Sequence, residues 1–205
     1  MRSCHSPRRY GGPRTTTACG ARRRRAGDLV RLMLSLLATW FMVAGNKAHA
    51  EPALEGEVEA TYLYKFAPFV DWPPRLFPSP DTPLNICVLQ DDPLGPLLEQ
   101  AANGQRDGTR PISVHRLAPT DSGEGCHIFY FQYDSSAGSQ IAQKLRTQPV
   151  LTVTNSDKAP GSAIVAFVVE NGHVRFDIDN AAASRVGLQV SSNLLALARS
   201  VVRSP

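Results

Sequence analysis

The segment Asn85–Gly104, which reads NICVLQ-DDP-LGPLLEQAA-NG, decides the fold class of this chain. The opening run NICVLQ has the length and the apolar character of a strand that is buried on both faces. Asp91-Asp92-Pro93 then turns the chain into a helical pattern over 94–102, which Asn103-Gly104 ends. A buried strand followed at once by a helix predicts a β–α unit of a parallel sheet.

The same alternation continues along the chain. We predict further strands at 112–117, 126–132 and 149–154, and helices at 135–146, 180–186 and 191–202. The runs 163–170 and 173–179 flank Asn171-Gly172, which is the strongest short signal for a β-hairpin. The predicted fold class is therefore α/β, a three-layer, mostly parallel, doubly wound sheet with a late antiparallel β-hairpin. Right-handed crossovers place the first and third strands of such a sheet side by side.

Before the first strand, 55–72 has the apolar periodicity of a helix. Pro68 removes one backbone donor and should loosen the last turn, and Pro73-Pro74 should end the helix.

Several aromatic residues lie close together in this segment. Core packing explains the helix face that carries Tyr62, Phe66 and Phe69. Tyr64 points away from that face, and Trp72 lies at the helix end, where exposed aromatic rings suit a protein contact. We therefore predict Tyr64, Phe69 and Trp72 as candidate partner-binding residues, with core packing as the alternative.

The charges of the chain are segregated. Residues 1–50 carry ten of the 22 lysines and arginines and one of the 18 acids, Asp28, so residues 51–205 are net negative although the whole chain is +4. An apolar run at 32–43 follows the basic residues and is shorter than most membrane spans. Ala48-His49-Ala50 then has the small residues of a signal-peptide cleavage site.

These features predict that 1–50 is an export signal, with a disordered start, that is cleaved after Ala50. Residues 51–205 would then form a single domain in the periplasm. An N-terminal membrane anchor is the alternative interpretation. Because residues 51–205 are net negative once that segment is removed, we predict no binding to nucleic acid.

Two cysteines, Cys87 and Cys126, remain outside the predicted signal. An even cysteine count in an exported chain favours a disulfide, and these two residues fall on strands predicted to be neighbours. The bond would close a loop worth about 4 kcal/mol in the chain-entropy model. Two buried free thiols are the alternative.

No motif for catalysis or for a cofactor is present. The sequence contains no G-x-S-x-G elbow, no Walker loop and no G-x-G-x-x-G after the first strand. His115, His127 and His173 do not stand in any close metal-ligand spacing. We therefore predict no enzyme activity, no catalytic residue, no metal and no cofactor.

Segments spread along the chain resemble YfiR-type periplasmic proteins. The matching segments are TYLYKFA at 61–67, FVDWP at 69–73, ICVL at 86–89, DDPLG at 91–95, CHI at 126–128, PVLTV at 149–153, 164–169, VRFDI at 174–178, AAA at 181–183, GL at 187–188, SS at 191–192 and LL at 194–195. They occur in order and cover nearly all of 51–205.

The resemblance implies a YfiR-like α/β domain, often a homodimer, in the periplasm. Well-understood YfiR proteins repress a membrane-bound diguanylate cyclase by binding its periplasmic sensor domain, which lowers cyclic di-GMP and disfavours biofilm formation. An outer-membrane lipoprotein can sequester the repressor. The family's cysteine pair matches Cys87 and Cys126, while a second pair known in some relatives is absent. Pro68 replaces a residue that is usually polar or basic.

The resulting hypothesis is a periplasmic repressor that acts by protein–protein binding. The rival hypothesis is a solute-binding or accessory domain of a transport or sensor system. Its site would be the crevice at the carboxyl ends of the strands, near 90–92 and 132–135. A deep pocket with convergent polar groups favours the rival, and a shallow surface with exposed aromatic rings favours the repressor.

Overall fold

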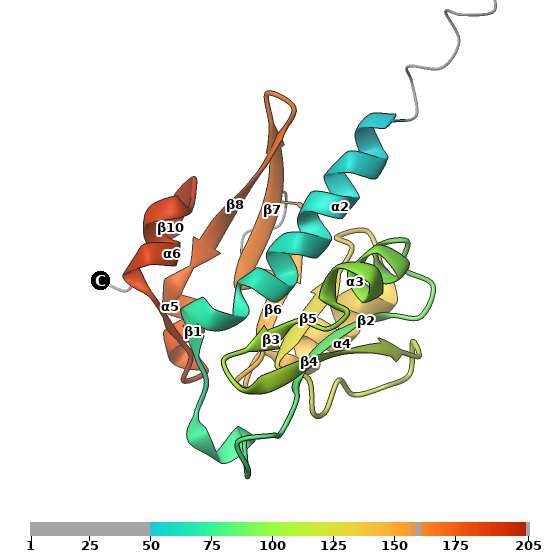
Figure 1. Ribbon diagram of the computed structural model, residues 1–205. Coiled ribbons are helices and arrows are strands. Elements are labelled where there is room, and N and C mark those ends of the chain that lie inside the picture. Colours follow the sequence, from blue (N-terminus) through green and yellow to red (C-terminus); the bar gives the residue numbers. More distant parts are fainter. Residues whose placement is uncertain (1–49, 157, 159–160, 204–205) are drawn as a thin grey trace, which may run out of the picture. The chain divides into compact units, whose positions relative to one another are not determined.

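The computed structural model of the chain describes residues 50–156, 158 and 161–203, all of which belong to one compact unit (Figure 1). The predicted export signal and its cleavage residue Ala48 lie outside the described residues. Ala50 is the first residue of helix α2.

The described residues form helices, short 3-10 turns and strands in the order of a β–α protein. The helices are α2 (Ala50–Lys65), α3 (Leu94–Ala102), α4 (Ser136–Leu145), α5 (Asn180–Arg185) and α6 (Ser192–Leu197), with 3-10 turns η1 (Ala67–Phe69) and η2 (Pro74–Leu76). The strands are β1 (Val70–Asp71), β2 (Leu84–Leu89), β3 (Arg106–Asp107), β4 (Arg110–Leu117), β5 (Ile128–Phe131), β6 (Leu151–Thr154), β7 (Val165–Glu170), β8 (His173–Asp179), β9 (Gln189–Val190) and β10 (Ser200–Val202).

The main sheet has the strand order β10-β8-β7-β6-β5-β2-β4-β3. Strands β4, β2, β5, β6 and β7 pair in parallel, whereas β8 is antiparallel to β7. The first and third predicted strands, β2 and β5, are neighbours, with Cys87 opposite Phe129. The predicted mixed, mostly parallel, doubly wound sheet is therefore confirmed.

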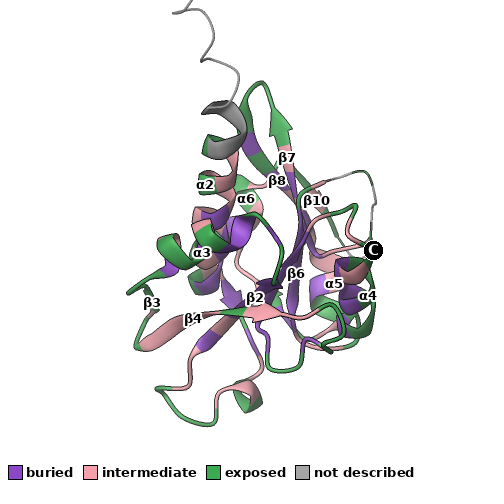
Figure 2. Ribbon diagram, turned by 90° about the vertical axis from the view of Figure 1, so that its right-hand side faces the viewer, coloured by how far each residue is buried: buried purple, intermediate pink, exposed green. Residues whose placement is uncertain are grey.

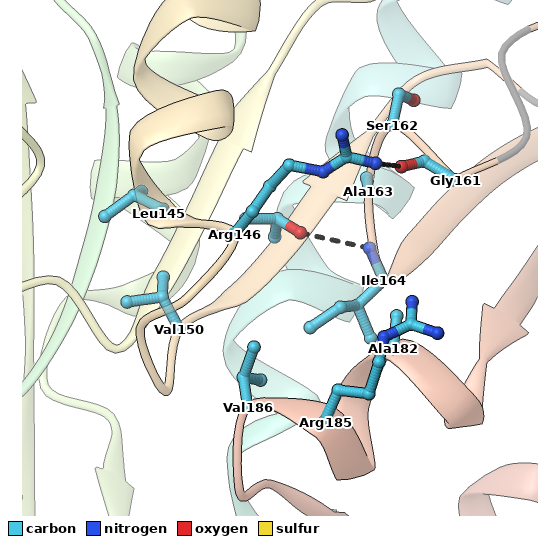
Figure 3. Close-up of a pocket in the computed structure, with 11 residues that line it drawn as sticks. Leu145, Arg146, Val150, Gly161, Ser162, Ala163, Ile164, Ala182, Arg185 and Val186 are labelled. Carbon is cyan, nitrogen blue, oxygen red and sulfur yellow. Dashed lines mark hydrogen bonds between the residues drawn. The ribbon is translucent and has the colours of Figure 1, made fainter.

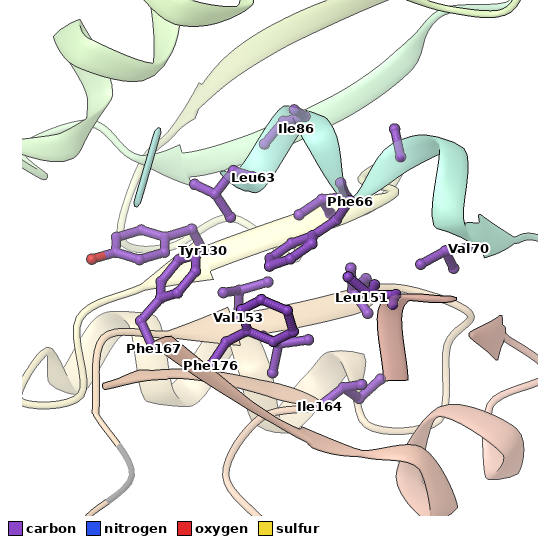
Figure 4. Packing of buried hydrophobic residues seen from close by; sticks show 14 of the residues in the cluster. Leu63, Phe66, Val70, Ile86, Tyr130, Leu151, Val153, Ile164, Phe167 and Phe176 are labelled. Carbon is purple, nitrogen blue, oxygen red and sulfur yellow. The ribbon is translucent and has the colours of Figure 1, made fainter. Parts of the chain in front are cut away.

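Helices cover both faces of this sheet. The larger core lies on the face covered by α2 and α3, where Leu63 and Phe66 pack with strand residues such as Val153 (Figure 4). The smaller core lies on the other face, where Ile141 of α4 packs with Phe129. Alternate residues of β5 therefore enter different cores, as the two-residue period of a strand requires. Figure 2 shows burial concentrated on β6 and on the sheet-facing sides of α2 and α3.

The predicted helix 55–72 is wrong at its carboxyl end. Helix α2 ends at Lys65, and the chain continues through η1 into β1, which pairs with β9. Pro68 lies at the start of η1, because its ring fixes φ and its missing N–H cannot continue the helical ladder. The proline thus ends the helix instead of loosening its last turn.

The predicted helix 191–202 is also wrong at its carboxyl end. Helix α6 ends at Leu197, and 200–202 form β10, which runs parallel to β8. The arginine between them, Arg199, forms an ion pair with Asp177 of β8 and donates its backbone N–H to Phe176. Tertiary pairing with β8 thus overrides the helical periodicity of this segment.

The local signals for turns and caps are confirmed. Asn171 and Gly172 connect β7 and β8 with φ values of 53° and 73°, which is the left-handed conformation that a tight hairpin turn needs. The Ser135 hydroxyl accepts a hydrogen bond from the Gly138 N–H and caps α4.

Candidate functional site

A disulfide links the neighbouring central strands β2 and β5 of the main sheet. Cys87 in β2 and Cys126 immediately before β5 are bonded, with their Cα atoms 5.8 Å apart. Both residues are buried, at 2% and 5% exposed. The predicted bond is therefore present, and the alternative of two free thiols is wrong.

His127, next to the disulfide, is a packed residue. Its Nδ1 accepts a hydrogen bond from the Asn85 N–H at 3.1 Å, and the Asn85 side chain donates to the Gly125 carbonyl. Burial lowers the pKa of His127 to about 4, with the nearby Arg110 acting in the same direction. His127 is therefore neutral at physiological pH and anchors the loop that carries Cys126.

Trp72 does not have the exposure that the sequence predicted. It is 8% exposed, and its indole N–H donates to the His127 carbonyl at 3.3 Å. The Phe77 ring stacks on the His127 ring with centroids 4.5 Å apart, and the Arg110 guanidinium lies over Phe77. Pro73 and Pro74 begin the 3-10 turn η2 directly after Trp72, so the buried Trp72 anchors the start of this loop.

The other two predicted partner-binding residues are half-buried. Tyr64 and Phe69 both pack against the larger core. Because Trp72 is buried, the three residues do not form one exposed aromatic patch. A partner role for Tyr64 and Phe69 stays a prediction.

An apolar groove runs along the outward side of α2. We call it the helix groove and define it by its lining residues, Leu54, Glu57, Val58, Thr61, Tyr62 and Lys65, which enclose about 380 Å³. Leu54 is 61% exposed. The Tyr62 ring contacts Phe66, Phe167 and Phe176, which fixes the floor of the groove to β7 and β8. This groove was not predicted, because the spacing of Tyr62 and Phe66 indicates a core face; the recurrence of Leu54, Val58 and Thr61 was the available signal.

A second hollow lies where the carboxyl ends of the central strands meet α2. We call it the switch-point crevice; it encloses about 460 Å³ and is lined by Glu55, Gly56, Glu59, Pro93, Leu94, Leu97, Tyr130, Gln132 and Asn155. The Tyr130 ring packs in the larger core while its hydroxyl points out of it (Figure 4) and donates to Glu59 at 3.2 Å.

The titratable groups of this region share an unfavourable environment for charge. Burial raises the pKa of Glu59 to about 7, against the opposing hydrogen bond from Tyr130. Burial also raises the pKa of Asp92, although the Leu94 N–H and Arg116 oppose it. The pKa of Tyr130 is raised by burial and by the neighbouring carboxylates. Glu59 is therefore partly protonated at neutral pH.

The residues named for the rival site divide between two hollows. Gln90, Asp91, Asp92, Gln132 and Ser135 line a hollow of about 200 Å³ between β2 and α4. Gln132 also lines the switch-point crevice. Asp92 is 6% exposed and accepts a hydrogen bond from the Leu94 N–H, so its first role is to fix the turn into α3.

A further hollow lies far from these strand ends, between α4, the segment before β7, and α5 (Figure 3). It encloses about 50 Å³. Arg146 closes one side by donating to the Gly161 carbonyl at 2.6 Å, as Figure 3 shows. This hollow has the size of one or two water molecules.

The described part of the chain offers no metal centre and no membrane span. Within 50–156, 158 and 161–203, no three His, Cys, Asp or Glu residues are grouped so that they could hold a metal ion. None of the helices in the same residues combines the length and the hydropathy needed to cross a bilayer.

A family model described as YfiR/HmsC-like matches residues 56–199, which extend from the first turns of α2 to the residue before β10. No curated protein matches the chain.

Proposed function

Because this chain belongs to the YfiR/HmsC-like family, we propose that it is a periplasmic regulatory protein that represses a membrane-bound diguanylate cyclase by contact with that enzyme's periplasmic sensor domain. The family match, which spans both cores and the disulfide, carries this proposal. A role without catalysis is supported by the family, which is regulatory and not catalytic.

The helix groove and the adjacent end of α2 are the surface we propose for the cyclase contact. Its lining combines the apolar or aromatic side chains of Leu54, Val58 and Tyr62 with Thr61 and with one acid and one base, Glu57 and Lys65. Such a combination of apolar floor and polar rim is common at protein interfaces. Tyr64 and Phe69, on the same helix and the turn after it, are the residues we propose to extend this contact.

Repression by binding requires a preference between two states of the cyclase. The repressor must bind the inactive sensor conformation more tightly than the active one, since equal affinity would shift nothing. Moving a cyclase from mostly active to mostly inactive needs an affinity ratio of about 10⁴. A homodimer, and release of the repressor by an outer-membrane lipoprotein, are further parts of this proposal.

The experiment measures binding of the protein, purified from the periplasm, to the purified sensor domain of a co-expressed cyclase. Leu54→Asp places a charge in the helix groove, and the matched control Leu197→Asp changes a leucine of α6 that is 63% exposed, against 61% for Leu54. We expect Leu54→Asp to weaken binding at least about tenfold, which is about 1.4 kcal/mol, and Leu197→Asp to leave it unchanged.

Two results would contradict this proposal. Absence of binding by the unmodified protein would remove the cyclase as its partner. Equal losses for the two leucine variants would place the contact outside the helix groove. Size-exclusion chromatography with light scattering on the same samples tests the homodimer.

A further inference from the structure

The switch-point crevice occupies the place where open α/β sheets bind ligands. The connection from β2 leads through α3 to β4, and the connection from β5 leads through α4 to β6, so the strand order reverses between β2 and β5. The two helices cover opposite faces of the sheet. The connections that follow the two strands diverge at such a point and leave a crevice at the carboxyl ends of the strands.

The walls of the crevice combine apolar and polar groups from several elements. Pro93, Leu94 and Leu97 form an apolar wall at the start of α3. The Tyr130 hydroxyl and the Gln132 side chain come from β5 and the residue after it, and Asn155 follows β6. A volume of about 460 Å³ with a few polar groups on an apolar wall is typical of sites for small organic molecules.

The charge of the crevice is negative. Glu55 and Glu59 of α2 line it, and none of its described lining residues is a lysine, an arginine or a histidine. Arg116, which acts on the neighbouring Asp92, is not among the lining residues: its Nε pairs with Glu99 at 2.6 Å, and its Nη1 donates to the Gln90 and Asp92 carbonyls. The crevice therefore favours a cation and disfavours an anion.

We propose that the switch-point crevice binds a small organic cation that carries a primary ammonium group on a short apolar body. The ammonium group donates to the Glu59 carboxylate and lies within the field of Glu55. The apolar body packs on Leu94 and Leu97. A bare metal ion fits less well, because the described residues hold no group of three ligating side chains.

Glu59 gives the site a dependence on pH. The groups that face its carboxyl are Glu55 on its own helix, Asp92 before α3 and Tyr130 on β5. With a pKa of about 7, the carboxyl is ionised only in part at neutral pH. A cation binds the ionised form, so binding releases a proton and strengthens as the pH rises.

The test measures binding of tyramine, phenethylamine and cadaverine to the protein purified from the periplasm. Calorimetry gives the affinity, and amide chemical shifts in NMR spectra locate the site. The neutral 4-ethylphenol, which has the body of tyramine without the ammonium group, is the ligand control. We expect at least one amine to bind and to shift the amides of Leu94, Gln132 and Asn155, and 4-ethylphenol to bind at least tenfold more weakly.

Two variants of nearly unchanged shape test the role of the carboxylates. Glu59→Gln should lower the amine affinity at least tenfold and remove its rise between pH 6 and pH 8. Glu55→Gln leaves the hydrogen bond from Tyr130 to Glu59 intact. It should lower the amine affinity by a smaller factor and keep the increase of that affinity between pH 6 and pH 8. Glu57→Gln, which removes an acid of the helix groove on the same helix, should change neither.

The proposal is overturned if no amine of the panel shifts those amides at 10 mM. It is overturned equally if 4-ethylphenol binds as tightly as tyramine, because the site would then be apolar only. An affinity for the amines that is unchanged in Glu59→Gln, with the variant's melting curve showing a folded protein, would contradict the assigned role of Glu59. Each of these outcomes is independent of the cyclase contact.

Discussion

The two faces of the central sheet are held together in different ways. On one face, α2 and Phe66, the residue after it, close the larger core mainly by packing, including the stacked and edge contacts of Phe66 with Phe167 and Phe176. On the other face, α4 closes a smaller core that also contains the disulfide between Cys87 and Cys126.

The two faces also differ in the hollows that they carry. On the α4 face, Gly138 lets α4 approach Phe131 so nearly that an added Cβ would lie 2.7 Å from the Phe131 Cβ, and the hollow between β2 and α4 is only about 200 Å³. The face of α2 carries the helix groove and the switch-point crevice. We infer that the cross-linked face keeps the sheet intact while the packed face presents the binding surfaces.

The largest expected effect is the loss of packing under α2. Phe66→Ala should lower the free energy of unfolding by about 3–5 kcal/mol, because Phe66 is fully buried and its removal leaves a cavity. Denaturant unfolding measures this change. Phe129→Ala on the opposite face should cost a similar amount.

The two variants differ in binding, which sharpens the comparison of the faces. Phe66→Ala loosens the helix that carries the groove, so we expect it to weaken binding to the cyclase sensor domain under conditions where the variant is still folded. Phe129→Ala should keep that affinity. Equal loss of affinity in both variants would show that the two faces are not separable.

The disulfide should have the next largest effect. The double variant Cys87→Ala/Cys126→Ala should lose about 2–4 kcal/mol of stability without reductant, since the bond closes a separation of 39 residues in the unfolded chain. Melting curves with and without reductant measure this. Unmodified protein whose melting temperature is the same in both conditions would show that the bond contributes nothing to the α4 face.

The smallest expected effect concerns the pH dependence of the α2 face. The folded protein holds Glu59 at a pKa of about 7, above the ordinary value of 4.5, so the folded state binds more protons than the unfolded state between these values. Glu59 therefore makes the protein less stable as the pH rises through this window, by at most about 3 kcal/mol. His127 acts in the opposite sense below pH 6.5, because its pKa is lowered to about 4.

Comparison with a variant isolates the contribution of Glu59 from that of His127. Glu59→Gln should gain stability relative to the unmodified protein as the pH rises from 5 to 8, and Glu57→Gln, on the exposed side of α2, should not. Urea unfolding at several pH values measures the difference. A difference between Glu59→Gln and the unmodified protein that stays constant with pH would show that burial does not hold the Glu59 proton.

Local patterns in the sequence predicted the β–α units and the disulfide. The run NICVLQ, the turn at Asp91-Asp92-Pro93 and the cap at Ser135 are signals that act within a few residues, and each is found in the structure. The neighbouring positions of Cys87 and Cys126 followed from the handedness of crossovers. The Asn171-Gly172 hairpin is equally local.

The candidate sites depend on contacts between distant residues and were harder to predict. The sequence placed Trp72 on the surface, whereas the rings of Phe77 and His127, from two distant segments, pack edge-on against it in the fold. The sequence does not distinguish Glu59 from the other acids of its helix, because only the fold brings it to Tyr130, 71 residues away. The short strand β10 exists because its backbone pairs with β8, which no period in its own sequence indicates.

The central claim is that this protein regulates a cyclase by recognition. Its most direct test is the level of cyclic di-GMP in cells that express the candidate cyclase, with the gene for this chain intact, deleted, or restored as the Leu54→Asp or the Leu197→Asp variant. We predict that deletion raises cyclic di-GMP, that the Leu197→Asp variant lowers it again and that the Leu54→Asp variant does not. An unchanged level of cyclic di-GMP on deletion would contradict the account.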